Sequence, residues 1–192
     1  MPVYKQSITD QSTIYESAGY PSYPSGGVHR GIDTVHGNHL AYAPASGTVI
    51  WVQVWDGHTT SGNMSWGNAI RVQMADGRVW LAAHFASQIW SVGATITKGD
   101  FIGTQGDTGN VTGVHTHWEL WSSTAGGLND PSSLLGIPNS APATYQVEWD
   151  ATDPPGPGPG PGPGPGPDPP TPTPTRKIPL WMYLKPIYRY GR

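Results

Sequence analysis

From Asp153 onward the composition of the chain changes abruptly, and this change limits how much of the chain can fold. Twelve of the 21 prolines and six of the 26 glycines lie between Pro154 and Pro174. Repeated Pro-Gly steps offer too few backbone donors for a sheet and no side chains for a core. Glycine recurs at every second residue and not at every third, which excludes a collagen helix. We therefore expect one folded domain in residues 1–150, a disordered Pro/Gly-rich linker in 151–175 and a short tail in 176–192.

Charge divides the chain in the same way. Residues 1–150 carry five Lys and Arg against eleven Asp and Glu, a net charge of −6, whereas residues 176–192 carry five Lys and Arg and no acid, a net charge of +5. The acidic domain argues against a nucleic-acid partner. The tail combines basic and aromatic residues, which favours contact with a wall polymer or an anionic membrane surface; a plain disordered end is the alternative. Without cysteine, the chain has neither disulfides nor thiolate metal ligands.

Short strand patterns between glycine-rich turns dominate the first 150 residues, and no helical pattern stands out. Residues 68–74 alternate, with Ile70, Val72 and Met74 on one face, and Asp76-Gly77 then marks a hairpin turn. Further strands are expected in 48–55, 78–84 and 115–121, and the segments 98–103 and 106–109 predict tight turns around a short strand. The segment 62–67 resembles a loop, and 131–142 is expected to be irregular structure. This pattern predicts an all-β domain, built as a compact antiparallel sheet or sandwich.

Seven histidines in a chain with few charged residues suggest a metal site. His115 and His117 flank Thr116 on a predicted strand, so their imidazoles point to the same face. His29 and Asp33 add an imidazole and a carboxylate in another extended segment. A catalytic zinc takes three nitrogen or oxygen ligands and leaves a fourth position to water, which suits two histidines and one carboxylate. The chain has no His-Glu-x-x-His motif, so its spare histidines are the candidates for proton transfer.

Longer stretches around these residues resemble the lysostaphin/LytM-type zinc peptidoglycan endopeptidases, from about residue 19 to residue 135. The family pattern is His-x-x-x-Asp, then a lone histidine after the central hairpin, then His-x-His. The matching segments are His29-Arg-Gly-Ile-Asp33, Ala43-Pro-Ala-Ser-Gly-Thr-Val49, Leu81-Ala-Ala-His-Phe85, Lys98-Gly-Asp-Phe-Ile-Gly103 and the segment from Gly106 to His117. Several segments in the same order are far more specific than any single motif.

The resemblance implies that residues 1–150 form a zinc metallopeptidase domain. His29, Asp33 and His117 correspond to the zinc ligands. His84 and His115 correspond to the catalytic histidines, which assist proton transfer or stabilise the developing charge. A tyrosine near the site is also expected to contact substrate; Tyr23 is the candidate and Tyr20 the alternative. Thr116 stands where relatives have an apolar residue, and since its side chain should face away from the metal, the change should affect packing only.

For other polar and aromatic residues, an ordinary structural role is weighed against a functional one. Strand alternation places His84 opposite Val79, Leu81, Ala83 and Phe85, so a buried structural histidine is the alternative to a catalytic one. Glu119 shares a strand face with His117; contact with the site is one interpretation, and an ordinary exposed glutamate is the favoured one. Three histidines in predicted loops are expected to be solvated, namely His36, His39 and His58. Two tryptophans, Trp66 and Trp121, are candidates to line a groove.

The predicted function is hydrolysis of peptide bonds in peptidoglycan stems or cross-bridges by a zinc-activated water, in a monomeric enzyme. Which bond is cut, in a polyglycine bridge or another link, stays open. The polar residues after Met1-Pro-Val-Tyr-Lys5 predict no signal peptide. This favours a phage- or prophage-type lytic enzyme that acts at the cell wall and is cytoplasmic until release, or is associated with a virion. The alternatives are a non-catalytic wall-binding or amidase-activating module and a virion structural protein.

Overall fold

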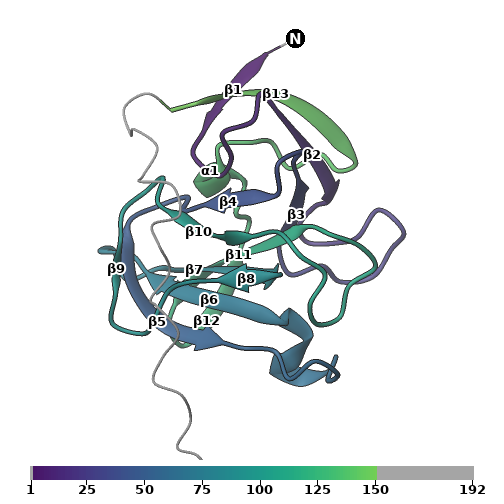
Figure 1. Cartoon of the computed structure of the whole chain (residues 1–192). Coiled ribbons are helices and arrows are strands. Elements are labelled where there is room, and N and C mark those ends of the chain that lie inside the picture. The colour runs from purple at the N-terminus through teal and green to yellow at the C-terminus, as the bar shows by residue number, and fades with distance from the viewer. Residues whose placement is uncertain (1, 151–192) are drawn as a thin grey trace, which may run out of the picture. The chain divides into compact units, whose positions relative to one another are not determined.

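The computed structural model describes residues 2–150, and these are almost entirely β-structure (Figure 1). The linker expected at 151–175 and the tail expected at 176–192 lie outside the described residues. No helix within residues 2–150 is long and apolar enough to cross a membrane. The elements are β1 (Val3–Gln6), β2 (Thr13–Ala18), β3 (Ile32–Val35), β4 (Leu40–Tyr42), β5 (Gly47–Gln53), η1 (Gly62–Trp66), β6 (Asn68–Gln73), β7 (Val79–Phe85), β8 (Ser87–Gln88), β9 (Thr95–Ile96), β10 (Phe101–Thr104), β11 (Thr116–Ser123), β12 (Gly126–Asn129), α1 (Ser132–Leu135) and β13 (Ala143–Trp149).

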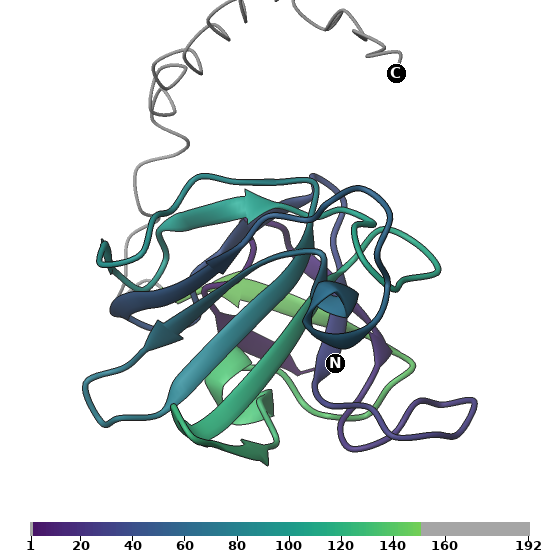
Figure 2. The same ribbon diagram turned by 90° about the horizontal axis from the view of Figure 1, so that it is seen from below.

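The strands form one large sheet and one small sheet. The 10-stranded sheet has the order β1-β13-β2-β3-β11-β7-β6-β5-β9, with β12 paired to β11, and the 3-stranded sheet has the order β4-β10-β8. Figure 2 shows the strands of the large sheet side by side, with the η1 helix against them. The predicted all-β antiparallel architecture is confirmed, with one departure, because the ladder between β1 and β13 is parallel.

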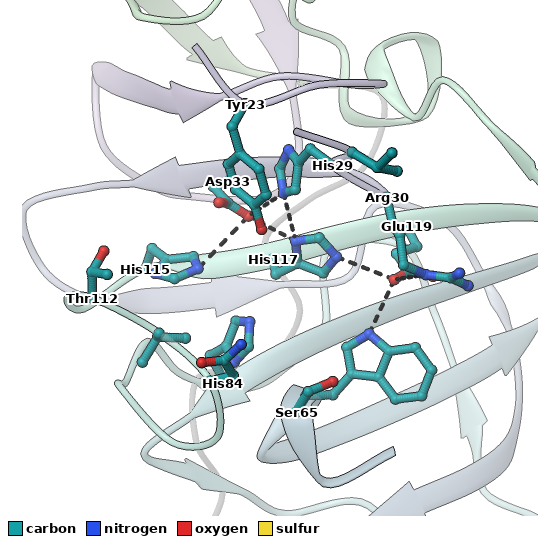
Figure 3. A pocket seen from close by; sticks show the side chains of 14 residues that line it. Tyr23, His29, Arg30, Asp33, Ser65, His84, Thr112, His115, His117 and Glu119 are labelled. Atoms are coloured by element: carbon teal, nitrogen blue, oxygen red, sulfur yellow. Dashed lines mark hydrogen bonds and ion pairs between the residues drawn. The ribbon is translucent and has the colours of Figure 1, made fainter. Parts of the chain in front are cut away.

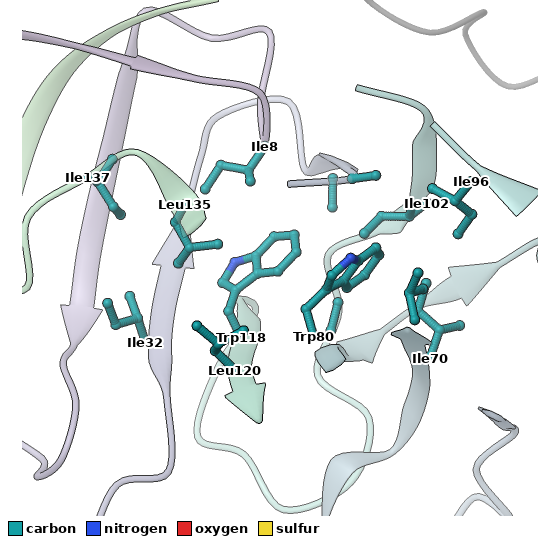
Figure 4. Close-up of a cluster of buried hydrophobic side chains, with 14 of the residues drawn as sticks. Ile8, Ile32, Ile70, Trp80, Ile96, Ile102, Trp118, Leu120, Leu135 and Ile137 are labelled. Carbon is teal, nitrogen blue, oxygen red and sulfur yellow. The ribbon is translucent and has the colours of Figure 1, made fainter. Parts of the chain in front are cut away.

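The hydrophobic core lies between the small sheet and one face of the large sheet. Trp80 of β7 and Trp118 of β11 are fully buried there and pack in the same cluster as Ile102 of β10 (Figure 4). Period-2 alternation turns their neighbours Leu81 and His117 to the opposite face. Removing either indole is expected to cost about 3–5 kcal/mol of stability. The core therefore fixes β7 and β11, the two strands that carry most of the candidate site.

The predicted hairpin between β6 and β7 is present. Gly77 has φ 87° and its N–H donates to the Met74 carbonyl at 3.0 Å, which is the tight turn that Asp76-Gly77 indicates. Two expectations need correction. The segment 62–67 is not a plain loop, because residues 62–66 form the 3₁₀ helix η1, and the segment 131–142 contains the short helix α1. Both are single turns, too short for a 3.6-residue pattern to show in the sequence.

Candidate active site

Pairing of β3 with β11 brings two of the three candidate ligands, Asp33 and His117, together. Asp33 lies directly opposite His117 in this antiparallel ladder. Gly31 permits the close approach of the two strands, because a Cβ atom at residue 31 would lie 1.8 Å from the carbonyl oxygen of Trp118. The glycine between His29 and Asp33 is therefore required by packing, and the segment holds both side chains against β11.

Three donor atoms converge at this point (Figure 3). Nε2 of His29 lies 3.1 Å from Nδ1 of His117 and 3.2 Å from Oδ1 of Asp33, and Nδ1 of His117 lies 2.7 Å from the same oxygen. Four tetrahedral ligands about 2.0 Å from a zinc ion are about 3.3 Å apart. The triangle is close to these dimensions, and the three buried residues form a group able to hold a metal ion.

The outer nitrogen of each of the two histidines in this triangle is anchored. Nδ1 of His29 donates to the Gly19 carbonyl at 2.7 Å, and Nε2 of His117 donates to Oε1 of Glu119 at 3.2 Å. In the neutral form of both rings, which a metal ion requires, these hydrogen bonds leave the lone pairs of His29 Nε2 and His117 Nδ1 directed at the shared point. Such anchoring fixes the tautomer and the ring orientation that a metal ligand needs.

His84 and His115 lie beside the triangle without belonging to it. The His115 ring is 4.8 Å from the His84 ring between centroids, and Nε2 of His115 is 3.6 Å from Oδ1 of Asp33. Nδ1 of His115 bonds the Gly113 carbonyl at 2.8 Å, and Nδ1 of His84 bonds the Thr108 carbonyl at 2.8 Å. In the neutral form each ring therefore presents an unprotonated Nε2 to the site.

A β-bulge explains how His84 reaches this face. Asn68 pairs with Phe85 and Ile70 pairs with Ala82, so three steps on β7 oppose two on β6. His84 lies in this bulge with φ 68°, a left-handed conformation that is uncommon for a residue with a Cβ atom. Regular alternation would have placed His84 on the core face, and the bulge returns Phe85 to the core instead.

The charges of the site are strongly coupled. Burial disfavours the Asp33 carboxylate, but hydrogen bonds and charge from His117, His29 and His115 hold the pKa of Asp33 far below its usual range. Burial together with the charges of His117 and His115 lowers the pKa of His84 to about 3. Burial also opposes the ionised form of Glu119, but the hydrogen bonds and charges of His117, Trp121 and Arg30 lower its pKa to about 2. Asp33 and Glu119 are thus carboxylates, and His84 is neutral, at pH 7.

A cavity of about 310 Å³ opens over this group of side chains. Its lining includes Tyr23, Trp66 and Thr112 around the histidines. The Tyr23 ring stacks on His29 with a centroid distance of 4.2 Å and an interplanar angle of 29°. Tyr20, the alternative tyrosine, instead packs against the hydrophobic core. Of the two tyrosines, Tyr23 is therefore the one that lies at the cavity.

Two expectations about polar side chains are wrong. Glu119 is not an exposed glutamate but is fully buried, and it accepts hydrogen bonds from Arg30, Trp66, Trp121 and His117. Its position two residues after His117 on the same strand face was the signal for this role. His36 is not solvated but 3% exposed, whereas His39 and His58 are exposed as expected. None of these three loop histidines joins the group around Asp33.

The sequence profile of peptidase family M23 matches residues 27–130, more than half of the chain. The chain belongs to peptidase family M23. The matched region contains the whole triangle and both neighbouring histidines, and begins after Tyr23. This M23 chain has the residues to hold one metal ion, because His29, Asp33 and His117 all keep side chains that can act as metal ligands.

The chain is also similar to individual proteins and solved structures. The chain is 32% identical over 106 residues to morphogenesis protein 1 of Bacillus phage B103, covering 52% of this chain but only 28% of the phage protein. The catalytic domain of lysostaphin, an antimicrobial peptidase from Staphylococcus simulans, is 27% identical with a TM-score of 0.51, covering 62% of this chain and 90% of that domain. The catalytic domain of the prophage-encoded M23 protein EnpA from Enterococcus faecalis has a TM-score of 0.55 at 24% identity, covering 66% of this chain and 95% of that domain, and supports the fold.

Proposed function

We propose that the chain is a zinc metalloendopeptidase that hydrolyses peptide bonds in bacterial peptidoglycan. The observation that carries the proposal is the triangle of His29, Asp33 and His117, whose edges of 2.7–3.2 Å match a tetrahedral zinc site. A bound zinc ion would supply the Lewis acid that polarises a scissile carbonyl and acidifies a water. The similarity to lysostaphin, a peptidase, supports this class of reaction.

The two neighbouring histidines provide the proton transfers. Nε2 of His115 lies 3.6 Å from Oδ1 of Asp33 and carries a lone pair in the neutral ring, so it accepts the proton of the attacking water. The Asp33 carboxylate stabilises the imidazolium that results. His115 then returns this proton to the nitrogen of the leaving amine as the peptide C–N bond breaks. His84, neutral at pH 7, orients the water through a hydrogen bond to its Nε2.

Tyr23 is placed to contact the substrate. Its ring covers His29 at the edge of the cavity, and 42% of the residue is exposed. Burial and the charges of Asp33 and Glu119 raise the pKa of Tyr23, so its hydroxyl keeps its proton at pH 7. We infer that this hydroxyl donates a hydrogen bond to a carbonyl of the bound peptide.

A phage- or prophage-type enzyme acting at the cell wall is the setting we propose. The similarity to morphogenesis protein 1 of a Bacillus phage supports it, and equally supports a role as a virion-associated component that carries a peptidase domain. A non-catalytic wall-binding or amidase-activating module is less compatible with a complete triangle and two anchored histidines. The non-catalytic alternative differs from the proposal in whether the purified chain cuts peptidoglycan.

The test is digestion of purified sacculi of several wall types by the full chain, with mass spectrometry of the newly exposed termini. We expect new amino and carboxyl termini at one kind of peptide bond, and loss of cleavage with a metal chelator that added zinc reverses. The His115→Ala variant is the matched inactive control. Released sugars without new peptide termini, or no cleavage of any wall type by zinc-loaded protein, would exclude the endopeptidase proposal.

A further inference from the structure

Two arginines and three tryptophans form a cluster beside the metal group, on the same face of the large sheet. We call this the Arg–Trp cluster; its members are Arg30, Trp51, Trp66, Arg71 and Trp121. Strand register places two members, Trp51 and Arg71, in one row with Glu119: Trp51 pairs with Arg71, Arg71 with Leu81, and Leu81 with Glu119. Asp33, His117 and Ala83 form the neighbouring row, two residues further along the strands. The two rows are thus about 7 Å apart, the length of two residues of an extended peptide.

The Arg71 guanidinium lies among the indole rings. Its Cζ atom is 4.2 Å from the ring centroid of Trp121, 4.5 Å from that of Trp51 and 4.9 Å from that of Trp66. Such contacts hold a cation in place without consuming its hydrogen-bond donors. The indole faces also shield the guanidinium from water, which strengthens any charge-assisted hydrogen bond that it makes.

Arg30 holds a second cation next to the first. Its side chain is 49% exposed, it lines the cavity over the metal group, and its Cζ atom is 5.9 Å from the ring centroids of both Trp66 and Trp121. In the described part of the chain, the Arg30 side chain uses only its Nε, in a 3.2 Å hydrogen bond to Glu119. Both Nη groups of Arg30 therefore remain available to a ligand.

The cluster carries a positive charge that residues 2–150 do not fully balance. Within residues 2–150 the side chain of Arg71 makes no hydrogen bond and no ion pair, and its Nε is buried without a partner. By contrast, Arg78 pairs with Asp76 on the surface. Glu119 is the one acid in contact with the cluster in the described part of the chain, and it already serves Arg30, two indoles and His117. Two cations against one carboxylate leave a net charge of +1 here, in residues whose total charge is −6.

We propose that Arg30 and Arg71 bind a free carboxylate of the peptide substrate, on the side of the metal group where the Arg–Trp cluster lies. A planar guanidinium matches a carboxylate in charge and geometry, and the anion would offset the repulsion between the two arginines. The inference rests on the proposed function and narrows it. The substrate class is a stem peptide that carries a free carboxylate near the cleaved bond, and not an uncharged polyglycine bridge.

The test compares cross-linked muropeptides with their carboxylates free against the same muropeptides with those groups converted to carboxamides. We expect full-length wild type to cleave the free form with a kcat/KM at least about tenfold higher. Arg71→Gln should reduce this ratio to within about twofold of one, and Arg71→Lys should restore part of it. Arg78→Gln removes the same charge far from the cluster and should leave the ratio unchanged. Zinc content is also measured in each variant. Arg71 contacts none of the triangle residues His29, Asp33 and His117, so its replacement should leave the zinc content unchanged.

Binding of the same two muropeptides to His115→Ala, followed by tryptophan fluorescence, gives a measurement that does not depend on turnover. We expect the free form to bind at least about tenfold more tightly, and Arg71→Gln added to this background to remove the difference. Equal binding of both forms, or binding of neither, overturns the carboxylate site. If equal binding is accompanied by cleavage of both forms, the endopeptidase proposal stands and only the carboxylate site fails.

Discussion

Nε2 of His117 lies 3.2 Å from the carboxylate of Glu119, so the ring of the last triangle residue is oriented by an acid two positions along its own strand. Glu119 is fully buried and its position is fixed by two indole N–H groups and Arg30. The carboxylate therefore determines that Nδ1 of His117, and not Nε2, faces Asp33. Four residues from three parts of the chain thus set the direction of one lone pair.

Glu119→Gln should weaken zinc binding without unfolding the domain. An amide can still contact His117 but no longer stabilises the tautomer by charge, and loss of such an outer partner typically costs about 10- to 100-fold in metal affinity. The measurement is competition for zinc with a chelator of known affinity. Glu148→Gln, on the exposed side of β13, is the control and should bind zinc like wild type. Unchanged affinity in Glu119→Gln would show that the carboxylate does not tune this ligand.

His84→Ala and His115→Ala should keep their zinc and lose activity. Neither residue belongs to the donor triangle, but both present Nε2 beside it. Loss of an acid–base group lowers turnover by roughly two to four orders of magnitude. Cleavage of sacculi and metal content are measured on the same samples, with the exposed His58→Ala as control. Near-native turnover in either variant would remove that histidine from the mechanism.

Gly31→Ala should disrupt the site through the backbone. The new Cβ atom would lie 1.8 Å from the Trp118 carbonyl oxygen, so β3 must move away from β11 and separate Asp33 from His117. We expect a loss of about 3 kcal/mol or more in the free energy of unfolding, together with loss of zinc. Gly37→Ala is the matched control, because the nearest atom to its Cβ would be Gln11 Oε1 at 3.6 Å. Equal urea midpoints for both variants would contradict the packing role of Gly31.

His36 should make stability depend on pH. Burial is the main cause that lowers the pKa of His36 from 6.5 to about 4; the charge of His39 acts in the same direction, while Asn38 and Asp10 oppose it. The unfolded chain therefore binds a proton between pH 6.5 and pH 4 that the folded chain does not. The contribution of His36 is complete above pH 6.5 and is lost as pH falls toward 4.

Wild type should lose about 2 kcal/mol more stability than His36→Gln between pH 7 and pH 5. Urea unfolding at the two pH values measures the free energy of unfolding of each protein. Both proteins are compared at equal metal content, so that the pH dependence of the metal group is the same in both. His58→Gln, at an exposed histidine, should follow wild type. If the free energy of unfolding changes with pH equally in wild type and in His36→Gln, the folded chain binds a proton at His36 as readily as the unfolded chain does, which would contradict this prediction.

The sequence predicts the central strands of the fold because local patterns determine them. Alternation in residues 68–74 and the Asp76-Gly77 turn correspond to β6 and its hairpin with β7. The parallel pairing of β1 with β13 joins residues more than 140 positions apart, and no local pattern specifies a partner at that distance. The single-turn helices η1 and α1 are likewise too short to leave a periodic signal.

The candidate site was predictable where motif order carries information, and not where it depends on irregular backbone or long-range contact. His29, Asp33 and His117 converge as the family pattern implies. Strand alternation fails at His84, because the bulge in β7 turns its side chain to the other face. The charge on Glu119 suggested exposure, and only the indoles and Arg30, from other segments, show how its carboxylate is stabilised when buried.

The most direct test of the account is the zinc content of purified full-length protein, measured by plasma emission alongside three single variants. We predict about one zinc per chain in wild type, and loss of that zinc in His29→Ala, Asp33→Ala and His117→Ala, because three protein ligands are the minimum for such a site. His36→Ala, at a buried histidine outside the triangle, should keep its zinc. Wild-type zinc content in all three triangle variants would contradict the assignment of this group as the metal centre.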